Sequence, residues 1–387
     1  MIFSHICAIF ETNLIKRKGK KPKGELKMKL TTKFLIFLLI FAMIIPAVAS
    51  CAKKTAADVH VFYYTYSDTY ISTVRSALDK ALTSAGVSYQ DHDSNNNQTT
   101  QTEQIQTAIT KGAKLLVVNI VTTGSDDAAS GIVSLAKDAG IPVIFFNREV
   151  SDSVVKSYDK CAFIGTDATE SGKLQGDMIG DYVVKNFDAV DLNKDGEISY
   201  VLFMGEKGNN EAIYRTRYSV ENANKKLTAA GKKELKFYDP SNPDKYLLDR
   251  DGKWSAQAAN EYMTTLLSSH STANKNMVEL IICNNDGMAE GAISALNGAG
   301  YNLGTKDSIA IPVFGVDATS AAKELIKSGK MAGTIKQDAE GMATAILKSV
   351  QNGIGGKALF SEMTNYNIDE NVAKLRIPYA VYLGEEN

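Results

Sequence analysis

Short apolar segments alternate with amphipathic ones along most of this 387-residue chain, and this alternation constrains the fold most strongly. The first apolar segment, Val59–Tyr64, precedes a segment with helical spacing that ends near Gly86. Further apolar segments follow, and the strands and helices expected after Gly86 are 87–91, 103–111, 115–119, 125–139 and 140–147. Strands that are apolar on both faces belong to parallel sheets covered by helices on both sides. The sequence therefore predicts an α/β fold.

The same plan occurs twice. Leu115–Asn119, a helix and Ile141–Asn147 correspond to Glu279–Asn285, a helix and Ile311–Asp317, and both second strands begin with Ile-Pro-Val. About 335 residues follow the N-terminal segment, which is enough for roughly two domains. We therefore expect two similar, Rossmann-like lobes with parallel sheets.

Polar residues end these strands. Asn119, Asn147, Asn285 and Asp317 stand at carboxyl ends, where ligands bind in open α/β sheets. Each could equally cap a helix or form a turn. Their equivalent positions in the two halves favour a ligand site between two lobes.

Amide and carboxylate groups beside aromatic rings suit neutral sugars, because hydroxyl groups donate and accept hydrogen bonds while rings cover the apolar sugar face. There are further candidates of these types. Three follow the first strand, two lie one helical turn apart, and one is the chain's single tryptophan. They are Tyr64, Asp68, Tyr70, Glu211, Arg215 and Trp254.

The segment Asp191–Ser199 has the pattern D-x-N-x-D-G-x-I-x, the start of an EF-hand calcium loop. Its expected oxygen ligands are Asp191, Asn193, Asp195, the carbonyl of Glu197, and Ser199. The twelfth position, normally Glu, is Leu202 inside an apolar strand. A calcium ion here therefore needs a carboxylate from elsewhere, and the loop is not a helix–loop–helix switch.

Residues 1–50 have the features of a signal or leader segment. Residues 1–27 are basic and suggest an over-extended start, with Met28 as an alternative; 34–45 are apolar but shorter than the ~20 residues of a membrane span. Val48–Cys51 resembles a bacterial lipobox, so Cys51 is the predicted lipidation site and 51–57 a lipidated linker; signal cleavage beside an unmodified cysteine is the alternative.

Composition argues against several functions. The net charge is −1 and no basic patch is interleaved with aromatic residues, so nothing indicates nucleic acid. The four histidines lie in no nucleophile elbow or zinc motif, and Gly205–Gly208 is no phosphate loop. A glycosidase using Asp68, Glu211 or Asp317 is the remaining enzyme alternative. Cys161 and Cys283 lie in apolar strands and are expected to be free, buried thiols.

From about Asp58 to Leu383 the chain resembles the galactose/glucose-binding proteins of bacterial sugar ABC transporters. The matching motifs are Tyr64–Tyr70, Val117–Asn119, Ser157–Lys160, Gly165–Asp167, Asp191–Ser199, Asn284–Met288, Pro312–Asp317 and Arg376–Tyr379. The calcium loop followed by a strand is specific to that subfamily. The resemblance implies a calcium site completed by Glu279, and a type I periplasmic binding protein fold.

In that fold the N-terminal lobe comprises 58–165 plus 338–370, and the C-terminal lobe 166–337 plus 371–387. The resemblance implies a three-segment hinge near Phe163–Thr166, Thr334–Asp338 and the tail after Asn367. Lobes closing around a ligand would provide the mechanism, without catalysis.

Carried over by position, the sugar contacts are Tyr64, Asp68, Tyr70, Asn119, Asn209, Glu211, Arg215, Trp254, Asn285, Asp317 and Gln337. Four depart from the family: Asn209 replaces His, Glu211 replaces Asp, Gln337 replaces Asn, and Tyr70 replaces Phe. Tyr70 and Trp254 would sandwich the ring. The implied ligand is galactose or glucose; another hexose or a pentose stays open because a site matched to hydroxyl groups discriminates strongly.

The expected protein is thus a monomeric, extracytoplasmic lipoprotein on the outer face of the cell membrane. Its implied partners are the permease subunits of an ABC transporter, with a chemoreceptor as an alternative. A sugar-responsive repressor shares this fold, but the space for its DNA-binding helices holds the signal segment instead.

Overall fold

The computed structural model describes residues 57–384. The predicted signal segment, the lipidation site at Cys51 and the linker up to residue 56 lie outside the described residues. Within the described part no helix is both long and apolar enough to span a membrane. Cys161 and Cys283 are buried and free, which confirms the prediction for both thiols.

The N-terminal lobe contains a seven-stranded sheet. From one edge to the other its strands are β12 (Asn367–Asp369), β13 (Lys374–Arg376), β5 (Cys161–Gly165), β4 (Val143–Phe146), β3 (Leu115–Val118), β1 (Val59–Tyr63) and β2 (Tyr89–Asp93). All neighbours pair in parallel except β12 and β13. The central strands are completely buried because helices cover both faces.

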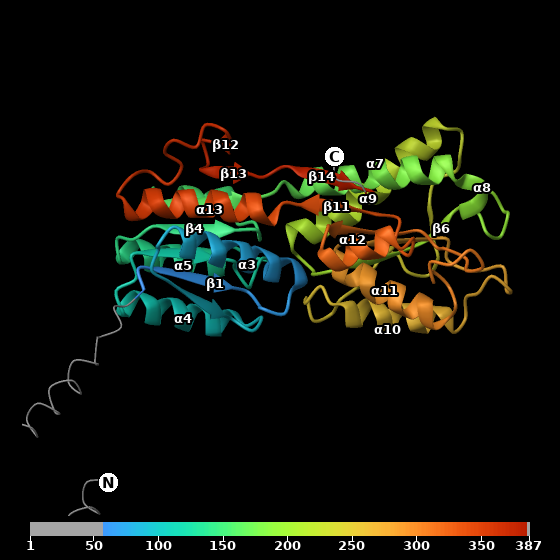
Figure 1. The fold of residues 1–387 in the computed structure, drawn as a ribbon, viewed down its shortest axis with the longest axis horizontal. Coiled ribbons are helices and arrows are strands. Elements are labelled where there is room, and N and C mark those ends of the chain that lie inside the picture. Colours follow the sequence, from blue (N-terminus) through green and yellow to red (C-terminus); the bar gives the residue numbers. More distant parts are fainter. Residues whose placement is uncertain (1–56, 385–387) are drawn as a thin grey trace, which may run out of the picture. The chain divides into compact units, whose positions relative to one another are not determined.

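Two layers of helices bury this sheet (Figure 1). On one face lie α3 (Thr69–Ser84) and α13 (Ala339–Ile354), which share an apolar core with β1, β3 and β4. The other face carries α4 (Gln98–Thr110), α5 (Asp127–Asp138) and α6 (Asp152–Lys156). The helix expected at 103–111 begins already at Gln98, because the Asn97 side chain caps it by accepting a hydrogen bond from the amide of Thr100.

The C-terminal lobe repeats this arrangement. Its strands run in the order β14 (Tyr379–Tyr382), β11 (Gly333–Gln337), β10 (Val313–Asp317), β9 (Leu280–Cys283), β6 (Ser199–Met204) and β7 (Lys236–Phe237), and β8 (Leu247–Leu248) also pairs with β6. One face is covered by α7 (Ala168–Lys185), α8 (Phe187–Val190) and α9 (Asn210–Ala229), the other by α10 (Ala256–Leu267), α11 (Asp286–Gly298) and α12 (Ser320–Lys327).

Both sheets share one strand order, β2-β1-β3-β4-β5 in the first and β7-β6-β9-β10-β11 in the second. The predicted α/β fold with two Rossmann-like lobes is confirmed. In each sheet the order reverses beside the first strand, and this switch point is where such sheets bind ligands, at the carboxyl ends of the strands.

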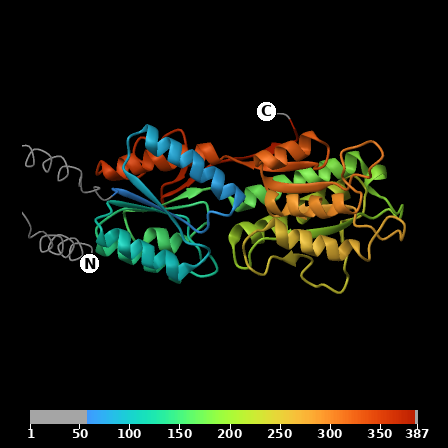
Figure 2. The same ribbon diagram turned by 60° about the horizontal axis from the view of Figure 1, so that its bottom comes forward.

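The chain crosses between the lobes three times, and the crossing segments can be followed in Figure 2. The first crossing joins β5 to α7, the second β11 to α13, and the third β13 to β14. The third differs from the expected boundary at 370/371, because Lys374–Arg376 pairs with β5 of the N-terminal sheet. This short strand contains a buried lysine, Lys374, so its sequence does not look like a sheet strand.

Three glycines spaced four residues apart let α7 and α9 pack closely. A Cβ atom on Gly172 would lie 2.4 Å from the carbonyl oxygen of Tyr214, and one on Gly176 would lie 2.6 Å from that of Tyr218. At Gly180 it would meet the Lys226 side chain at 2.5 Å. These distances are shorter than van der Waals contact, so larger side chains would force the two helices apart.

Candidate functional site

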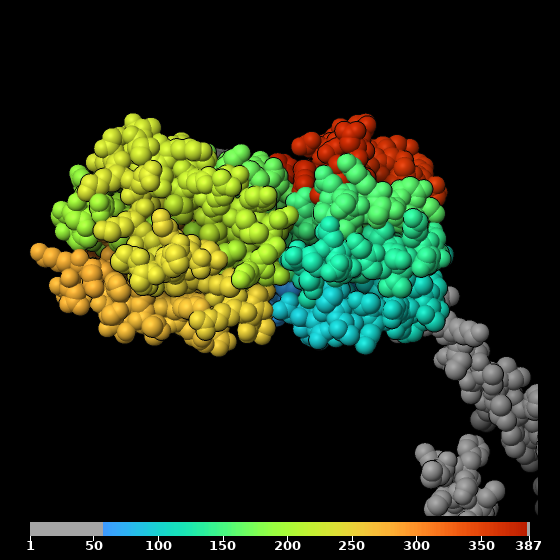
Figure 3. All heavy atoms as spheres, turned by 180° about the vertical axis from the view of Figure 1, so that it is seen from behind, coloured from blue at the N-terminus to red at the C-terminus, as the bar shows by residue number. Residues whose placement is uncertain are grey.

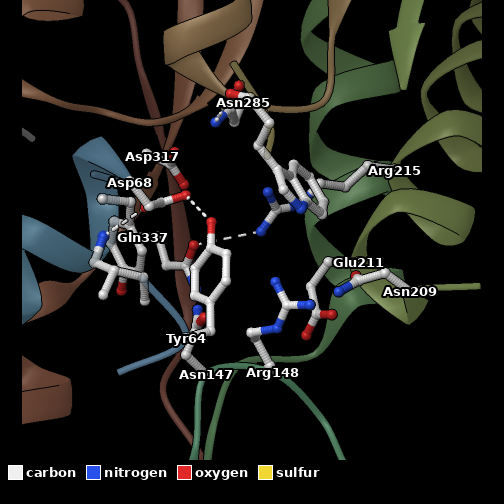
Figure 4. A pocket seen from close by; sticks show the side chains of 13 residues that line it. Tyr64, Asp68, Asn147, Arg148, Asn209, Glu211, Arg215, Asn285, Asp317 and Gln337 are labelled. Carbon is white, nitrogen blue, oxygen red and sulfur yellow. Dashed lines mark hydrogen bonds between the residues drawn. The ribbon is translucent and has the colours of Figure 1, made fainter. Parts of the chain in front are cut away.

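A pocket lies between the two lobes at the carboxyl ends of their strands, with an empty volume of about 360 Å³. Side chains from both lobes point toward it (Figure 4). The lining residues are Tyr64, Asp68, Tyr70, Ile71, Asn147, Arg148, Asn209, Glu211, Arg215, Trp254, Asn285, Asp317 and Gln337.

On the N-terminal side, Asp68 fixes the start of α3. One of its carboxylate oxygens caps the helix by accepting the amide of Ile71 at 2.7 Å, and the other accepts the Tyr64 hydroxyl at 2.6 Å. The Tyr64 ring also lies 4.2 Å from the guanidinium carbon of Arg148. One acidic side chain therefore orders both a helix terminus and an aromatic wall of the pocket.

On the C-terminal side, Arg215 is held by four hydrogen bonds. It donates to the Ser171 hydroxyl (3.3 Å), the Asn284 carbonyl (2.9 Å), the Gln337 side-chain oxygen (3.3 Å) and the Tyr379 hydroxyl (3.0 Å). Burial of the pocket wall and these bonds fix the guanidinium rigidly, 5.7 Å from the Trp254 ring.

The crossing segments are tied to each other at the same place. The Thr166 and Tyr379 hydroxyls share a hydrogen bond of 2.7 Å, and the Gln337 amide donates to Thr166 at 3.3 Å. Thr166, Gln337 and Tyr379 belong to the first, second and third crossings. Arg215 thus contacts the second and third crossings directly, and the first crossing through the bonds of Gln337 and Tyr379 to Thr166.

Two further carboxyl groups, those of Glu211 and Asp317, line the pocket. Both oxygens of Glu211 are buried and accept no hydrogen bond from the described residues. Burial raises the pKa of Glu211 to about 7, against the opposing effect of Arg215. Burial also raises the pKa of Asp317 well above its usual range. A ligand that donates hydrogen bonds would satisfy the unpartnered oxygens of Glu211.

The backbone around the pocket is strained. Asn147, Trp254, Asp317 and Ala318 have φ angles of 59°, 55°, 128° and 56°, in the left-handed half of conformational space that glycine normally occupies. Such residues persist only where surrounding structure holds them, and they gather at functional sites. Here the strain turns strand-end side chains toward the pocket.

The structure brings all the sugar-contact candidates from the sequence to the pocket wall except Asn119. Asn119 is fully buried behind the wall: its side-chain oxygen accepts the Tyr64 amide at 3.3 Å, and its nitrogen donates to the Phe146 carbonyl (3.2 Å) and the Asn147 side chain (3.3 Å). It positions Asn147, which does line the pocket. The strand-end rule indicated Asn147, whereas no sequence pattern distinguished Ile71 or Arg148.

Several of these residues are both helix caps and pocket walls. Asp68, Asn209 and Asn285 cap α3, α9 and α11 through hydrogen bonds to Ile71, Ala212 and Met288. Asn285 in addition donates to the Trp254 carbonyl at 3.2 Å. The sequence left open whether such residues cap helices or contact a ligand. Both can hold for the same residue, because helix N-termini surround the pocket.

The loop Asp191–Ser199 lies away from the pocket, and Glu279 reaches it. Glu279 immediately precedes β9, whose neighbour is β6. One oxygen of its carboxylate accepts the amides of Leu192 (2.8 Å) and Asn193 (3.2 Å), and the other accepts the Ser199 amide (2.9 Å) and hydroxyl (3.0 Å). The loop is thus clamped to its own lobe, whereas Leu202 is buried in β6.

The loop offers only oxygen donors to a cation. Asp191 has one oxygen bonded to the Gly196 amide at 3.0 Å, while its other oxygen is buried without a partner among the described residues. Asn193 and Asp195 add side-chain oxygens in the same turn. Among residues 57–384 no three His, Cys, Asp or Glu side chains form a metal cluster as they stand. Calcium also accepts amide and carbonyl oxygens, and with these the donor set of the loop fits a hard cation.

Comparisons with known proteins place the whole described fold in one group. Residues 59–358 match the family model described as a periplasmic binding protein domain. The D-galactose/methyl-galactoside binding periplasmic protein MglB of Haemophilus influenzae is 36% identical over 327 residues, which cover 84% of this chain and 89% of that protein. The D-xylose-binding periplasmic protein of Escherichia coli is 28% identical over 311 residues, 79% of this chain and 81% of that protein.

A solved structure agrees. An ABC transporter solute binding protein from Bacillus halodurans C-125 with bound myo-inositol superposes with a TM-score of 0.62 at 25% identity, covering 86% of this chain and 96% of that one. Its fold extends over both lobes. Together with the repeated sheets and the pocket between them, these matches show that the chain belongs to the periplasmic binding protein family.

Proposed function

We propose that this chain is the extracytoplasmic binding subunit of an ABC transporter for a monosaccharide, with galactose or glucose as the preferred ligand. The observation that carries the proposal is a pocket lined by the unpartnered carboxyl group of Glu211, a second carboxyl group at Asp317, a fixed guanidinium and three aromatic side chains. The similarity to a protein named for galactose supports the choice of sugar. Relatives named for xylose and ribose make another aldose the alternative.

The pocket suits the chemistry of a pyranose. Hydroxyl groups can donate to Glu211 and Asp317 and accept from Arg215, and the buried rings of Tyr70 and Trp254 can cover the apolar faces. Glu211 is one methylene longer than the aspartate of galactose/glucose-binding proteins, so it would reach a hydroxyl group from farther back. Asn209, Gln337 and Tyr70, which also differ from the residues of galactose/glucose-binding proteins, line the same pocket.

Transport follows from closure of the lobes. Ligand contacts come from both sides of the pocket, so binding stabilises the arrangement in which the lobes meet, as in other periplasmic binding proteins. The permease subunits would recognise that arrangement, and none of these steps is catalytic. A chemoreceptor is the alternative partner, since it would recognise the same ligand-bound form.

Galactose or glucose should raise the melting temperature of the purified protein, because a ligand that binds only the folded state stabilises it. Replacement of Trp254 by Ala should weaken binding about tenfold or more, equivalent to about 1.4 kcal/mol. Thermal-shift assays over a panel of hexoses, pentoses and myo-inositol, followed by calorimetry, would measure both. If no aldose raises the melting temperature, the sugar assignment is wrong.

Affinity should fall as the pH drops below about 7, the pKa to which burial raises Glu211. Hydroxyl donors favour the ionised carboxylate, which is fully present above that pKa and is lost as the pH decreases, by up to about tenfold in affinity per pH unit. In Glu211→Gln the affinity should be lower at high pH and vary less with pH, leaving only the contribution of Asp317. Titration calorimetry across pH checks this, with Glu221→Gln, an exposed residue on the same helix, as control. An unchanged slope in Glu211→Gln would contradict it.

We also propose that the loop binds calcium through Asp191, Asn193, Asp195, the carbonyl of Glu197, Ser199 and Glu279. The buried, unpartnered oxygen of Asp191 supports this site. A bound ion would neutralise the loop carboxylates and stabilise the C-terminal lobe.

Chelation of calcium should destabilise the protein, by about 2.7 kcal/mol relative to calcium at a hundred times its Kd. Glu279→Gln should weaken calcium binding strongly. Glu197→Gln should preserve it, because that side chain pairs at the surface with Lys233 and Lys236 and offers only its carbonyl to the site. Calcium titration by calorimetry distinguishes the variants. Wild-type calcium affinity in Glu279→Gln would mean that another group completes the site.

The same proposal includes a lipid anchor at Cys51, supported by the lipobox-like sequence Val48–Cys51. Cells grown with labelled fatty acid should incorporate the label into this protein, which should fractionate with membranes. Cys51→Ser should lose both the label and the membrane association. A wild-type protein without label would contradict the anchor.

A further inference from the structure

Glu206 lies in the segment between β6 and α9 and joins the two lobes. Its carboxylate accepts hydrogen bonds from Arg148 (2.6 Å), Asn209 (3.1 Å) and Trp254 (3.4 Å) on one oxygen, and from Thr123 (3.3 Å) on the other. Arg148 and Thr123 belong to the N-terminal lobe, Asn209 and Trp254 to the C-terminal lobe. Figure 3 shows the atoms of the two lobes meeting along this boundary.

Glu206 is not part of the pocket wall, yet three of its donors are. Its carboxylate orients the Trp254 indole through the ring N–H and the Asn209 side chain through the amide nitrogen. It also fixes Arg148, whose guanidinium lies against the Tyr64 ring. Aromatic and amide groups on opposite sides of the pocket therefore depend on one carboxylate outside it.

The contact with Arg148 is well shielded from water. The Arg148 side chain is 5% exposed and that of Glu206 18% exposed. Arg148 is anchored in its own lobe by donating to the Val121 carbonyl at 2.8 Å. The next residue, Glu149, bonds Lys374 and Arg376 of β13, the strand that leads into the third crossing. If the lobes separate, the ion pair must break while each partner stays attached to its own lobe.

We propose that Glu206 is a positioning residue that couples the geometry of the sugar site to closure of the lobes. It sets the orientation of Trp254 and Asn209 within one lobe and forms an ion pair with Arg148 only when the lobes meet. The apparent ligand affinity therefore depends on the fraction of molecules in which the Glu206–Arg148 contact is formed. The inference rests on the proposed sugar-binding function for the ligand, but the contact itself is independent of which ligand binds.

The test compares Glu206→Gln, Arg148→Gln and the double variant with wild type. Each single variant should lower sugar affinity at least tenfold by calorimetry. The double variant should lose little more than Glu206→Gln alone, because the Glu206–Arg148 contact is already absent in that single variant. X-ray scattering of the ligand-free protein should show a larger radius of gyration in the variants than in wild type.

Trp254 gives a second readout, because it is the chain's only tryptophan and donates to Glu206. Its fluorescence emission should shift in Glu206→Gln and less in Arg148→Gln, which leaves the carboxylate in place. Glu221→Gln is the matched control: it removes the charge of another Arg–Glu pair on α9, at the surface and within one lobe. It should leave affinity, scattering and emission at wild-type values.

The outcomes separate this inference from the proposed function. If wild type binds an aldose and Glu206→Gln binds it equally well with unchanged emission, the positioning role is overturned while sugar binding stands. If wild type binds no aldose but the variants shift scattering and emission, the coupling stands and the sugar assignment falls. Circular dichroism verifies folding; should Glu206→Gln not fold, Arg148→Gln tests the same ion pair through affinity and scattering.

Discussion

The hydrogen bonds of Arg215 are the interaction on which the rest of the site depends. This side chain begins on α9 and reaches the end of β9 through the Asn284 carbonyl, and two crossing segments through Gln337 and Tyr379. A buried guanidinium requires such partners, because an unpaired charge in this environment is strongly unfavourable. Satisfying it fixes α9 against the sheet and brings the crossings together beside the pocket.

The carboxyl group of Glu211 is in the opposite situation. Glu211 lies one turn from Arg215 on the same helix, yet its oxygens contact no donor among the described residues. The left-handed backbone at Asp317 brings a second carboxyl group to the pocket wall. The protein itself holds the Arg215 guanidinium with four hydrogen bonds and leaves the Glu211 carboxyl group for a ligand. This division explains how a rigid pocket can still gain free energy when it is filled.

Sequence periodicity was sufficient to predict the two sheets, because buried parallel strands such as Leu115–Val118 and Val143–Phe146 are apolar throughout. It was also sufficient for most of the pocket wall, since strand ends converge in this topology. It did not indicate β13, where Lys374 is buried only because Glu149 and Asp152 neutralise it. Nor did it distinguish Asn119 from Asn147, because which amide faces the pocket depends on the left-handed backbone at Asn147. Arg148 and Glu206 were missed because a contact between lobes leaves no periodic pattern.

The glycines of α7 bear on how the protein can move. At Gly172 and Gly176 the two helices are so close that sliding one past the other would bring neighbouring, larger side chains into collision. We therefore expect α7 and α9 to move as one rigid pair. This rigid pair begins at the first crossing, and because Gly172 packs against Tyr214, Glu211 and Arg215 lie at that same end. A ligand that binds those residues therefore acts on both helices together. The resulting rotation of the lobe is taken up by the three segments that cross between the lobes.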